Sequence, residues 1–463
     1  MSTRICTALL GLFLCATVVR AAELAPQPGP PRPFTIPTPT KLTLANGVQV
    51  TFIDFGSVPK VTIAINVRVG ALNDGEQTWL SDLTAELMKE GTEFRTAEQI
   101  AEEAAEMGGQ VAIGVGADQT TLSLDVLSEY GADAVALLAE ILTRPRLPES
   151  ELPRIRQNFL RNLSVQLATP QAQAEAAFAA LLFPNHPYGR VFPTPEQLQA
   201  YSIEDVRRFY ERNFGGQRTH VYVAGKFDRA RVEAAVRRHL GGWRDGPAPL
   251  RLPSPEPSEP VTVLIDRPDA PQSTLRIGLR VIDPSHPEFM PLSVTNTLLG
   301  GGLTSRITMN LRETKGWAYS PSSSVGAYYR HAVWAERADV KAESTGPALQ
   351  EIYREIDRLR REPPTDEELA SIKNYRNGIF VMSNASRVGL IGQFAFMDLH
   401  GLPTEWLTTF IDRLYAVTPE QVSQAAREHL EPTRMSVVVV GNLSQVRKQL
   451  EEIELLPKIQ AQQ

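Results

Sequence analysis

The chain has 463 residues, more than one hydrophobic core usually serves, and this length predicts roughly two to four domains. Hydrophobic residues make up 42% of it and charged residues 22%, which is the composition of an ordinary globular protein. The formal net charge of −6 argues against a nucleic-acid partner, because such a partner favours a basic surface.

The first residues have the pattern of an export signal. Arg4 precedes an apolar run from Ile5 to Val19, and Ala21 closes a small-residue cleavage site. The run is too short to favour a membrane span. We therefore expect residues 1–21 to be a signal peptide and the protein to be exported to the periplasm. Both cysteines would be removed with this signal, so the mature chain would have no disulfide and no thiolate ligand.

The residues after the signal predict an extended leader and then a mixed domain. Residues 22–40 are rich in proline, which favours an extended conformation. The elements predicted next are strands at 42–44, 48–53 and 61–69, helices at 78–90 and 97–107, strands at 111–116 and 120–127, helices between 132 and 182, a helix at 203–214, a strand at 221–224 and a helix at 229–240.

A second proline-rich stretch, residues 244–260, is the best domain boundary in the sequence. Beyond it the same order of elements recurs, with strands at 261–266, 274–281 and 332–340, helices at 289–299, 346–361 and 366–382, and a closing helix–strand–helix unit. This repeat predicts an α+β fold of two homologous domains, each an antiparallel-rich sheet with helices packed on it. The expected domains are residues 41–243 and 261–450, followed by a tail at 451–463, with a functional cleft between the two copies.

One segment of the second copy, from Gly300 to Ser320, combines a glycine hinge, a short helix and an extended stretch. Ser305 is expected to cap the helix at 306–315, and Gly316 to end it in the left-handed conformation. The segment carries two chemically useful side chains, Arg312 and Tyr319. An arginine at the end of a helix and a tyrosine just past it can converge on one peptide carbonyl or carboxylate.

Four features together resemble the insulinase or pitrilysin family of peptidases, in the two-domain form related to the mitochondrial processing peptidases. They are the doubled α+β unit and three sequence tracts: GTEFRTAEQIAEEAAEMGG at 91–109, HPYGR at 186–190 and LRETKGWAYS at 311–320. The resemblance covers nearly all of the chain beyond the signal and implies an internal chamber that receives peptides.

Active members of that family bind zinc through His-x-x-Glu-His on the first helix of the first domain and through a later glutamate. The positions that match these residues are Asp82, Ala85, Glu86 and, for the later glutamate, Asn162. Carboxylates replace both histidines, and alanine, which can take no proton, replaces the general base. The resemblance therefore implies that this chain carries no zinc and that zinc is held by a partner subunit.

The spacing of the seven histidines supports the same expectation. They are at least nineteen positions apart, so no helix can present two of them at zinc-binding spacing. A zinc site assembled from distant histidines stays open, as does a harder cation at Asp82 and Glu86, although an acidic pair at this spacing is commonly a solvated helix face. His186, beside a proline in its loop, is expected to be structural.

Arg312 and Tyr319 match the arginine and tyrosine with which the family's second domain contacts the substrate. The resemblance implies that they face the zinc across the chamber and hold the scissile peptide and its developing oxyanion. The alternative is structural: Arg312 would pair with a neighbouring acid, and Tyr319 would pack in the core with its hydroxyl satisfied.

The leading hypothesis is a zinc-free, peptide-binding subunit of an exported heterodimeric metallopeptidase. The chain would supply Arg312 and Tyr319, and a homologous zinc-bearing subunit would complete the site for unfolded peptide substrates. The rival hypothesis is a binding or scaffold protein of the same fold with no role in proteolysis. A self-sufficient hydrolase with a relocated site is a third possibility, although the sequence offers it no recognisable nucleophile or metal cluster.

Overall fold

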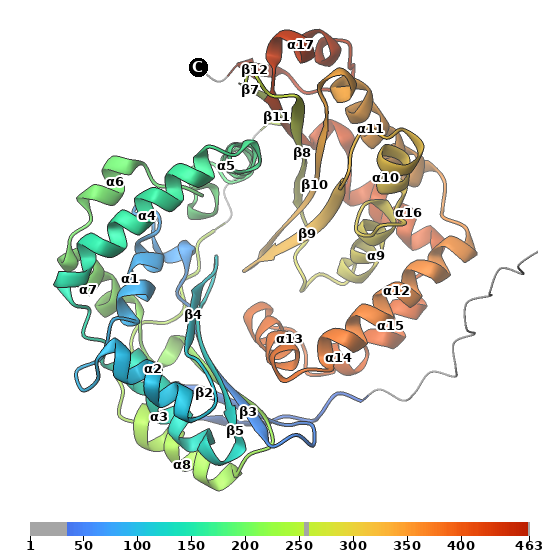
Figure 1. Cartoon of the computed structure of the whole chain (residues 1–463). Coiled ribbons are helices and arrows are strands. Elements are labelled where there is room, and N and C mark those ends of the chain that lie inside the picture. Colours follow the sequence, from blue (N-terminus) through green and yellow to red (C-terminus); the bar gives the residue numbers. More distant parts are fainter. Residues whose placement is uncertain (1–34, 254–258, 462–463) are drawn as a thin grey trace, which may run out of the picture. The chain divides into compact units, whose positions relative to one another are not determined.

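The computed structural model describes residues 35–253 and 259–461 (Figure 1). The predicted signal peptide, residues 1–21, lies outside the described residues, as do residues 22–34 of the predicted leader and residues 254–258 of the predicted linker. The chain separates into two units, Met1–Thr35 and Ile36–Gln463, and every element below belongs to the second.

The N-terminal half, residues 40–240, contains a mixed sheet and its helices. Its strands are β1 (Thr40–Thr43), β2 (Gln49–Asp54), β3 (Lys60–Val67), β4 (Ala112–Val115), β5 (Thr120–Leu127) and β6 (Thr219–Gly225). Its α-helices are α1 (Leu80–Met88), α2 (Ala97–Glu106), α3 (Gly131–Thr143), α4 (Leu152–Leu167), α5 (Pro170–Leu182), α6 (Pro195–Ala200), α7 (Ile203–Asn213) and α8 (Arg229–Leu240). Short 3-10 turns are η1 (Ala71–Asn73), η2 (Ser128–Tyr130), η3 (Glu149–Glu151), η4 (Pro187–Gly189) and η5 (Gly216–Arg218).

The C-terminal half, residues 262–461, is built in the same way. Its strands are β7 (Thr262–Asp266), β8 (Gln272–Val281), β9 (Ser322–Tyr328), β10 (His331–Lys341), β11 (Ser436–Gly441) and β12 (Ile459–Ala461). Its α-helices are α9 (Phe289–Leu299), α10 (Arg306–Thr308), α11 (Thr345–Arg361), α12 (Asp366–Asn384), α13 (Arg387–His400), α14 (Glu405–Thr408), α15 (Phe410–Ala416), α16 (Pro419–His429) and α17 (Leu443–Glu451). A π-helical turn, η6 (Met309–Thr314), follows α10, and 3-10 turns form at η7 (Ala342–Ser344) and η8 (Pro432–Arg434).

The two sheets have matching strand orders, β1-β2-β6-β3-β5-β4 and β12-β7-β11-β8-β10-β9. The pair β2–β6 is parallel in the first sheet, and its counterpart β7–β11 is parallel in the second. The edge strand β12 also runs parallel to β7, and the remaining neighbours are antiparallel. The predicted α+β fold with two homologous, antiparallel-rich sheets is therefore confirmed.

Each sheet buries both of its faces, and one face of each is covered by a helix from the other half. Along β3, Ile63 and Ile65 belong to the core that includes α3. Thr62 points to the opposite face, because side chains alternate along a strand, and there it meets Arg387 of α13. In the second sheet, Val438 and Val440 of β11 pack in one cluster with apolar residues of α5. Helix α5 of the N-terminal half thus covers the second sheet, and helix α13 of the C-terminal half covers the first, so the halves exchange one helix each (Figure 1).

Three features differ from or add to the sequence prediction. The predicted helix at 306–315 is a single α-helical turn followed by the π-helical turn η6. Helix α13 was not predicted as an element, and strand β9 continues the extended stretch predicted to begin at Tyr319. The last residues, expected to be a tail, include β12, which pairs with β7. No helix in the described ranges is both long and apolar enough to cross a membrane.

Candidate functional site

Arg312 and Tyr319 lie next to each other at the surface of the C-terminal half. The guanidinium carbon of Arg312 is 5.2 Å from the centre of the Tyr319 ring, within reach of a cation–π contact. Tyr319 is 79% exposed, so the alternative in which it packs in the core does not hold. Arg312 Nε also lies 3.1 Å from Glu313 Oε1, but this ion pair is largely exposed and therefore weak. Both side chains are available to a ligand.

The π-helical turn sets the orientation of Arg312. The N–H of Lys315 donates to the carbonyl of Asn310 at 3.0 Å, and Leu311, fully buried, anchors the turn in the core. Asn310 also ties this turn to α11, because its Nδ2 donates to Glu351 and Glu355 at 2.9 and 2.8 Å. Wider turns of this kind are frequent at functional sites. These contacts fix the backbone turn that carries the partly exposed Arg312.

Glycines and a serine shape the two ends of this segment. Gly316 has a φ of +64°, as the sequence predicted. A Cβ atom at Gly300 would lie 2.5 Å from Ser323 Oγ and 2.6 Å from Glu336 Oε2, so a larger residue would force these side chains to move. The predicted capping by Ser305 is wrong. Its hydroxyl donates to the carbonyl of Gly302 at 2.6 Å instead of accepting a helix N–H, because Ser305 is buried against the glycine turn.

Helix α1 carries the positions that match the family's metal motif. The helix begins after Trp79, whose φ is +67°, and the Asp74 carboxylate accepts hydrogen bonds from the N–H groups of Trp79 and Ser81 at 3.0 and 2.8 Å. Burial raises the pKa of Asp74 to about 7. Ala85 is buried in the core. The position that would need a general base therefore offers only a methyl group.

The two carboxylates on α1 are in different surroundings. Burial, and to a lesser degree the neighbouring Glu86, raises the pKa of Asp82 to about 6. Asp82 is therefore not a solvated surface acid. Glu86 Oε1 is 2.6 Å from the ammonium group of Lys89, so a fixed cation of the chain itself already stands at this position. Asn162 is exposed on α4.

The histidines do not rebuild a zinc site near α1. In the described part of the chain, one trio of possible ligand groups comes within 4.8 Å, namely Glu288, Glu428 and His429. Its closest pair, His429 Nε2 and Glu288 Oε2 at 2.9 Å, joins α16 to the start of α9. His186 is buried among aromatic rings, where burial lowers its pKa to about 4, and its Nδ1 accepts the N–H of Tyr188 at 3.2 Å. This is the structural histidine that the sequence predicted.

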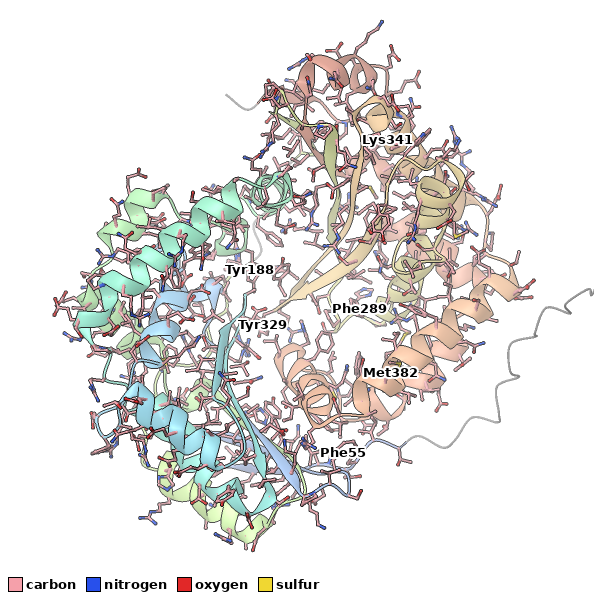
Figure 2. All side chains as sticks on the ribbon, viewed as in Figure 1. Phe55, Tyr188, Phe289, Tyr329, Lys341 and Met382 are labelled. Carbon is pink, nitrogen blue, oxygen red and sulfur yellow. The ribbon has the colours of Figure 1, made fainter. Side chains whose placement is uncertain are left out.

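An aromatic cluster next to His186 joins the two halves. The hydroxyl of Tyr188 donates to Asp118 Oδ1 at 2.5 Å, and the N–H of Tyr329 donates to Asp118 Oδ2 at 3.1 Å. The rings of Tyr188 and Tyr328 have their centres 4.7 Å apart. Figure 2 labels Tyr188 and Tyr329, which come from η4 and from the turn between β9 and β10. The HPYGR tract at 186–190 therefore serves as part of the joint between the halves.

Two charged residues that the sequence did not single out lie in the C-terminal half with little exposure: Glu336 is completely buried and Arg376 is partly buried. Glu336 of β10 is completely buried, and this burial raises its pKa well above the usual range. Burial lowers the pKa of Arg376, on α12, to about 10. Each lies in an element whose pattern looks ordinary, and no motif or spacing in the sequence distinguishes either residue from a surface charge.

Comparisons with known proteins match both halves of the chain to one peptidase family. Residues 52–196 match the family described as "Insulinase (Peptidase family M16)", and residues 200–375 match the one described as "Peptidase M16 inactive domain". An "Uncharacterized zinc protease" of Mycobacterium tuberculosis (strain ATCC 25618 / H37Rv) is 25% identical over 425 residues, which cover 90% of this chain and 96% of that protein.

Solved structures of low sequence identity share the fold. The peptidase M16 inactive domain from Pseudomonas fluorescens matches with a TM-score of 0.80 at 23% identity, over 87% of this chain and 98% of that chain. The periplasmic protease PqqL from Escherichia coli matches with a TM-score of 0.75 at 16% identity, over 91% of this chain and 49% of that chain. Because consecutive parts of the sequence match this family and both halves have its fold, the chain belongs to the insulinase family of peptidases, family M16.

Proposed function

We propose that this chain is the zinc-free, peptide-binding subunit of an exported heterodimeric metallopeptidase. One observation carries the proposal: a partly exposed Arg312 stands next to the exposed Tyr319, whereas α1 offers Asp82, Ala85 and Glu86 where the family's zinc motif would lie. The partner would be a homologous subunit with an intact His-x-x-Glu-His motif. Zinc would be bound by that partner, and no metal would be needed on α1 of this chain.

The chemistry of the pair suits the stabilisation of a peptide undergoing hydrolysis. When water attacks a peptide carbonyl, negative charge develops on its oxygen, and fixed cationic and phenolic donors stabilise that charge more than they stabilise the starting amide. Arg312 is held by the π-helical turn, and its ring contact with Tyr319 places both donors on one side of the segment. The substrates would be unfolded peptides whose backbone pairs with a sheet edge.

Export to the periplasm is part of the proposal. It rests on the sequence pattern of residues 1–21, and it is supported by the likeness to PqqL, which is described as a periplasmic protease.

The decisive experiment mixes this chain with a zinc-bearing subunit of the same family, such as one encoded beside it, and measures the hydrolysis of an unstructured peptide. The mixture is expected to cleave, and this chain alone is not. Arg312→Ala and Tyr319→Phe should each lower kcat/KM of the mixture by about 10² or more, because each removes a donor to the oxyanion.

Matched controls separate this role from a general effect on the surface. Arg361→Ala and Tyr415→Phe alter an exposed arginine and an exposed tyrosine of the same half and should leave cleavage unchanged. If the Arg312 and Tyr319 variants behave like these controls while the mixture still cleaves, the chain is a scaffold or binding subunit. Stoichiometric zinc and hydrolysis by this chain alone would overturn the proposal altogether.

A further inference from the structure

A cavity of about 550 Å³ lies on the C-terminal half between β9 and helices α9, α12, α13 and α15. Aromatic side chains form much of its wall, among them Phe289, Tyr375, Phe396, Trp406 and Phe410. Phe289 is labelled in Figure 2, where α9 begins. A second hollow of about 370 Å³ shares Phe289, Arg376, Trp406 and Phe410 with it. Together these walls suit a bulky apolar group.

Arg376 is the one cation among the residues that line this cavity. Its Nη1 donates to the carbonyl of Ser293 at 3.0 Å and to the hydroxyl of Thr297 at 2.8 Å, both on α9. Its Nε is enclosed and has no hydrogen-bond partner among the described residues. No carboxylate of the described chain lies within ion-pair distance of it. Arg376 is partly buried, and holding a cation there without an anion has a cost, so the site favours a ligand that brings negative charge.

Strand β9 supplies the other part of the site. It is the edge strand of its sheet and, in the part of the chain that the structure describes, it pairs with β10 alone. Ser323, Ser324 and Val325 line the cavity. On the outer side the N–H of Ser323 donates to the carbonyl of Gly300 at 2.9 Å. Along β9, the backbone groups that point away from β10 belong to every second residue. Since Ser323 uses its outward N–H on Gly300, the edge open to another strand begins two residues later, at Val325.

We propose that this cavity binds an extended peptide through its carboxylate, with Arg376 as the cationic partner and the edge of β9 as the backbone partner. The inference rests on the proposed function for the class of ligand, a peptide, and adds a preference for peptides that combine a bulky apolar side chain with a carboxylate. An exposed strand edge gives affinity for any extended backbone, and the lining of the cavity selects the side chain. The carboxylate can be the C-terminus of the peptide or an acidic side chain.

Arg376 gives this preference a physical basis. Burial lowers the pKa of Arg376 only to about 10, so the guanidinium stays charged at neutral pH. A carboxylate that enters the cavity would form a charge-assisted hydrogen bond with this partly buried guanidinium. An amide of the same shape would leave the cation without an anion. We therefore expect a difference of about tenfold to a hundredfold in Kd between the two.

The test uses the full chain alone and three peptides with the sequence Ala-Val-Thr-Val-Phe, each labelled at its N-terminus with an uncharged BODIPY dye. The first ends in a free carboxylate, the second ends in an amide, and the third ends in an amide and has glutamate in place of its second valine. Fluorescence anisotropy gives each Kd. One or both of the carboxylate peptides should bind at least about tenfold more tightly than the neutral amide, and the comparison between them identifies the source of the carboxylate.

Two variants locate the binding. Arg376→Met removes the charge, keeps an unbranched though shorter side chain, and should abolish the advantage of the carboxylate peptides. Gly392→Leu should block binding of all three, because Gly392 lines the cavity and a Cβ atom there meets nothing within 4 Å. Gly378→Leu is the matched control, since this helical glycine also has open space around its Cβ position but does not line the cavity.

Equal Kd values for the acid and the amide overturn the proposal, as does the absence of binding by any of the three peptides. Binding that survives Gly392→Leu places the peptide elsewhere and overturns it as well. Because the measurement needs no zinc-bearing subunit, it is separate from the cleavage assay. If the carboxylate preference is absent while the mixture still cleaves its peptide, this inference fails and the proposed function stands. If the preference is present while the mixture does not cleave, the proposed function fails.

Discussion

Asp82 shows how burial changes the chemistry of a single acidic side chain. It stands on α1 at the position that the sequence resemblance aligns with a histidine ligand; it is partly buried, and its pKa is raised to about 6, chiefly by burial and then by Glu86. A carboxylate in such a place destabilises the fold once it ionises. The position keeps an acid at a cost, and nothing in the structure explains why an acid is retained there.

We predict that Asp82→Asn stabilises the protein at neutral pH. The folded state holds the Asp82 proton up to about pH 6, whereas the unfolded state releases it near 3.8, so this contribution to stability is lost as pH rises between those values. Asparagine does not ionise, and the variant should gain up to about 3 kcal/mol above pH 6. Urea denaturation at pH 5, 7 and 8 measures the gain, which should be smaller at pH 5.

Glu102→Gln, which removes an exposed carboxylate of α2, is the control for this series and should show no such trend. A gain from Asp82→Asn that is equal at pH 5 and pH 8 would contradict the assignment of its cause to ionisation.

At the residue scale the sequence predicted side chains that are close along the chain and missed those that only the fold brings together. Arg312 and Tyr319 are separated by one turn and by Gly316, so local geometry alone allowed them to meet. Arg376 and the cavity it lines depend on helices α9, α13 and α15, which approach one another only through tertiary packing. Ser305 was misjudged because its burial, and not its local preference, decides where its hydroxyl donates.

Among the elements, α13 has the most unusual position. It belongs to the C-terminal half, yet it packs on β3 and β6 of the first sheet. Its first residue, Arg387, contacts Asp125 Oδ1 through Nη2 at 2.9 Å and Thr62 Oγ1 through Nε at 3.1 Å. Burial alone would raise the pKa of Asp125, but Lys60, Thr62 and Arg387 outweigh it, so the pKa is lowered. The carboxylate is thus held charged for this contact.

We predict that Arg387→Ala loosens α13 without unfolding the molecule. The ion pair is partly exposed, so the loss of global stability should stay at about 1 kcal/mol or less. Local opening should increase more, because this contact fixes the first turn of the helix. Hydrogen–deuterium exchange should accelerate in peptides that cover α13 and β3. Arg361→Ala, which alters an exposed pair within α11, should leave these peptides unchanged. Unchanged exchange in Arg387→Ala would show that apolar packing alone holds α13.

At the element scale, strong local signals explain most of the agreement between sequence and structure. The Asn46-Gly47 turn joins β1 and β2 as predicted, and Ser202 with Asp205 and Thr418 with Gln421 form capping boxes at the matching closing helices α7 and α16. The sequence could not predict the π-helical turn, because its register depends on Leu311 entering the core and on Asn310 reaching α11. Strand β12 escaped prediction because it is three residues long.

On the scale of the whole molecule, the exchanged helices make the halves depend on each other. Helix α5 shares an apolar cluster with β11, and Glu175 of α5 forms an ion pair with Arg276 of β8. Tyr222 of β6 donates a hydrogen bond to Asp398 of α13 at 2.9 Å. Each sheet would expose an apolar or partly polar face if the other half were absent.

We predict that neither half folds alone. Residues 35–253 and 259–461, expressed separately, should be insoluble or lack a cooperative thermal transition, whereas co-expression should yield a soluble complex that unfolds in one transition. A protease site introduced into the predicted linker, residues 244–260, should be cleavable without separating the halves on a sizing column. A folded, soluble N-terminal half on its own would contradict this interdependence.

The position of α13 also determines when the first sheet can be completed during synthesis. The helix that covers one face of β3 and β6 begins at Arg387, so the ribosome must translate most of the chain before that face can be closed. Until then the N-terminal half keeps an open sheet face and stays accessible to chaperones and proteases. A chain cut short before α13 would therefore be removed by quality control, even though every strand of its first sheet had been made.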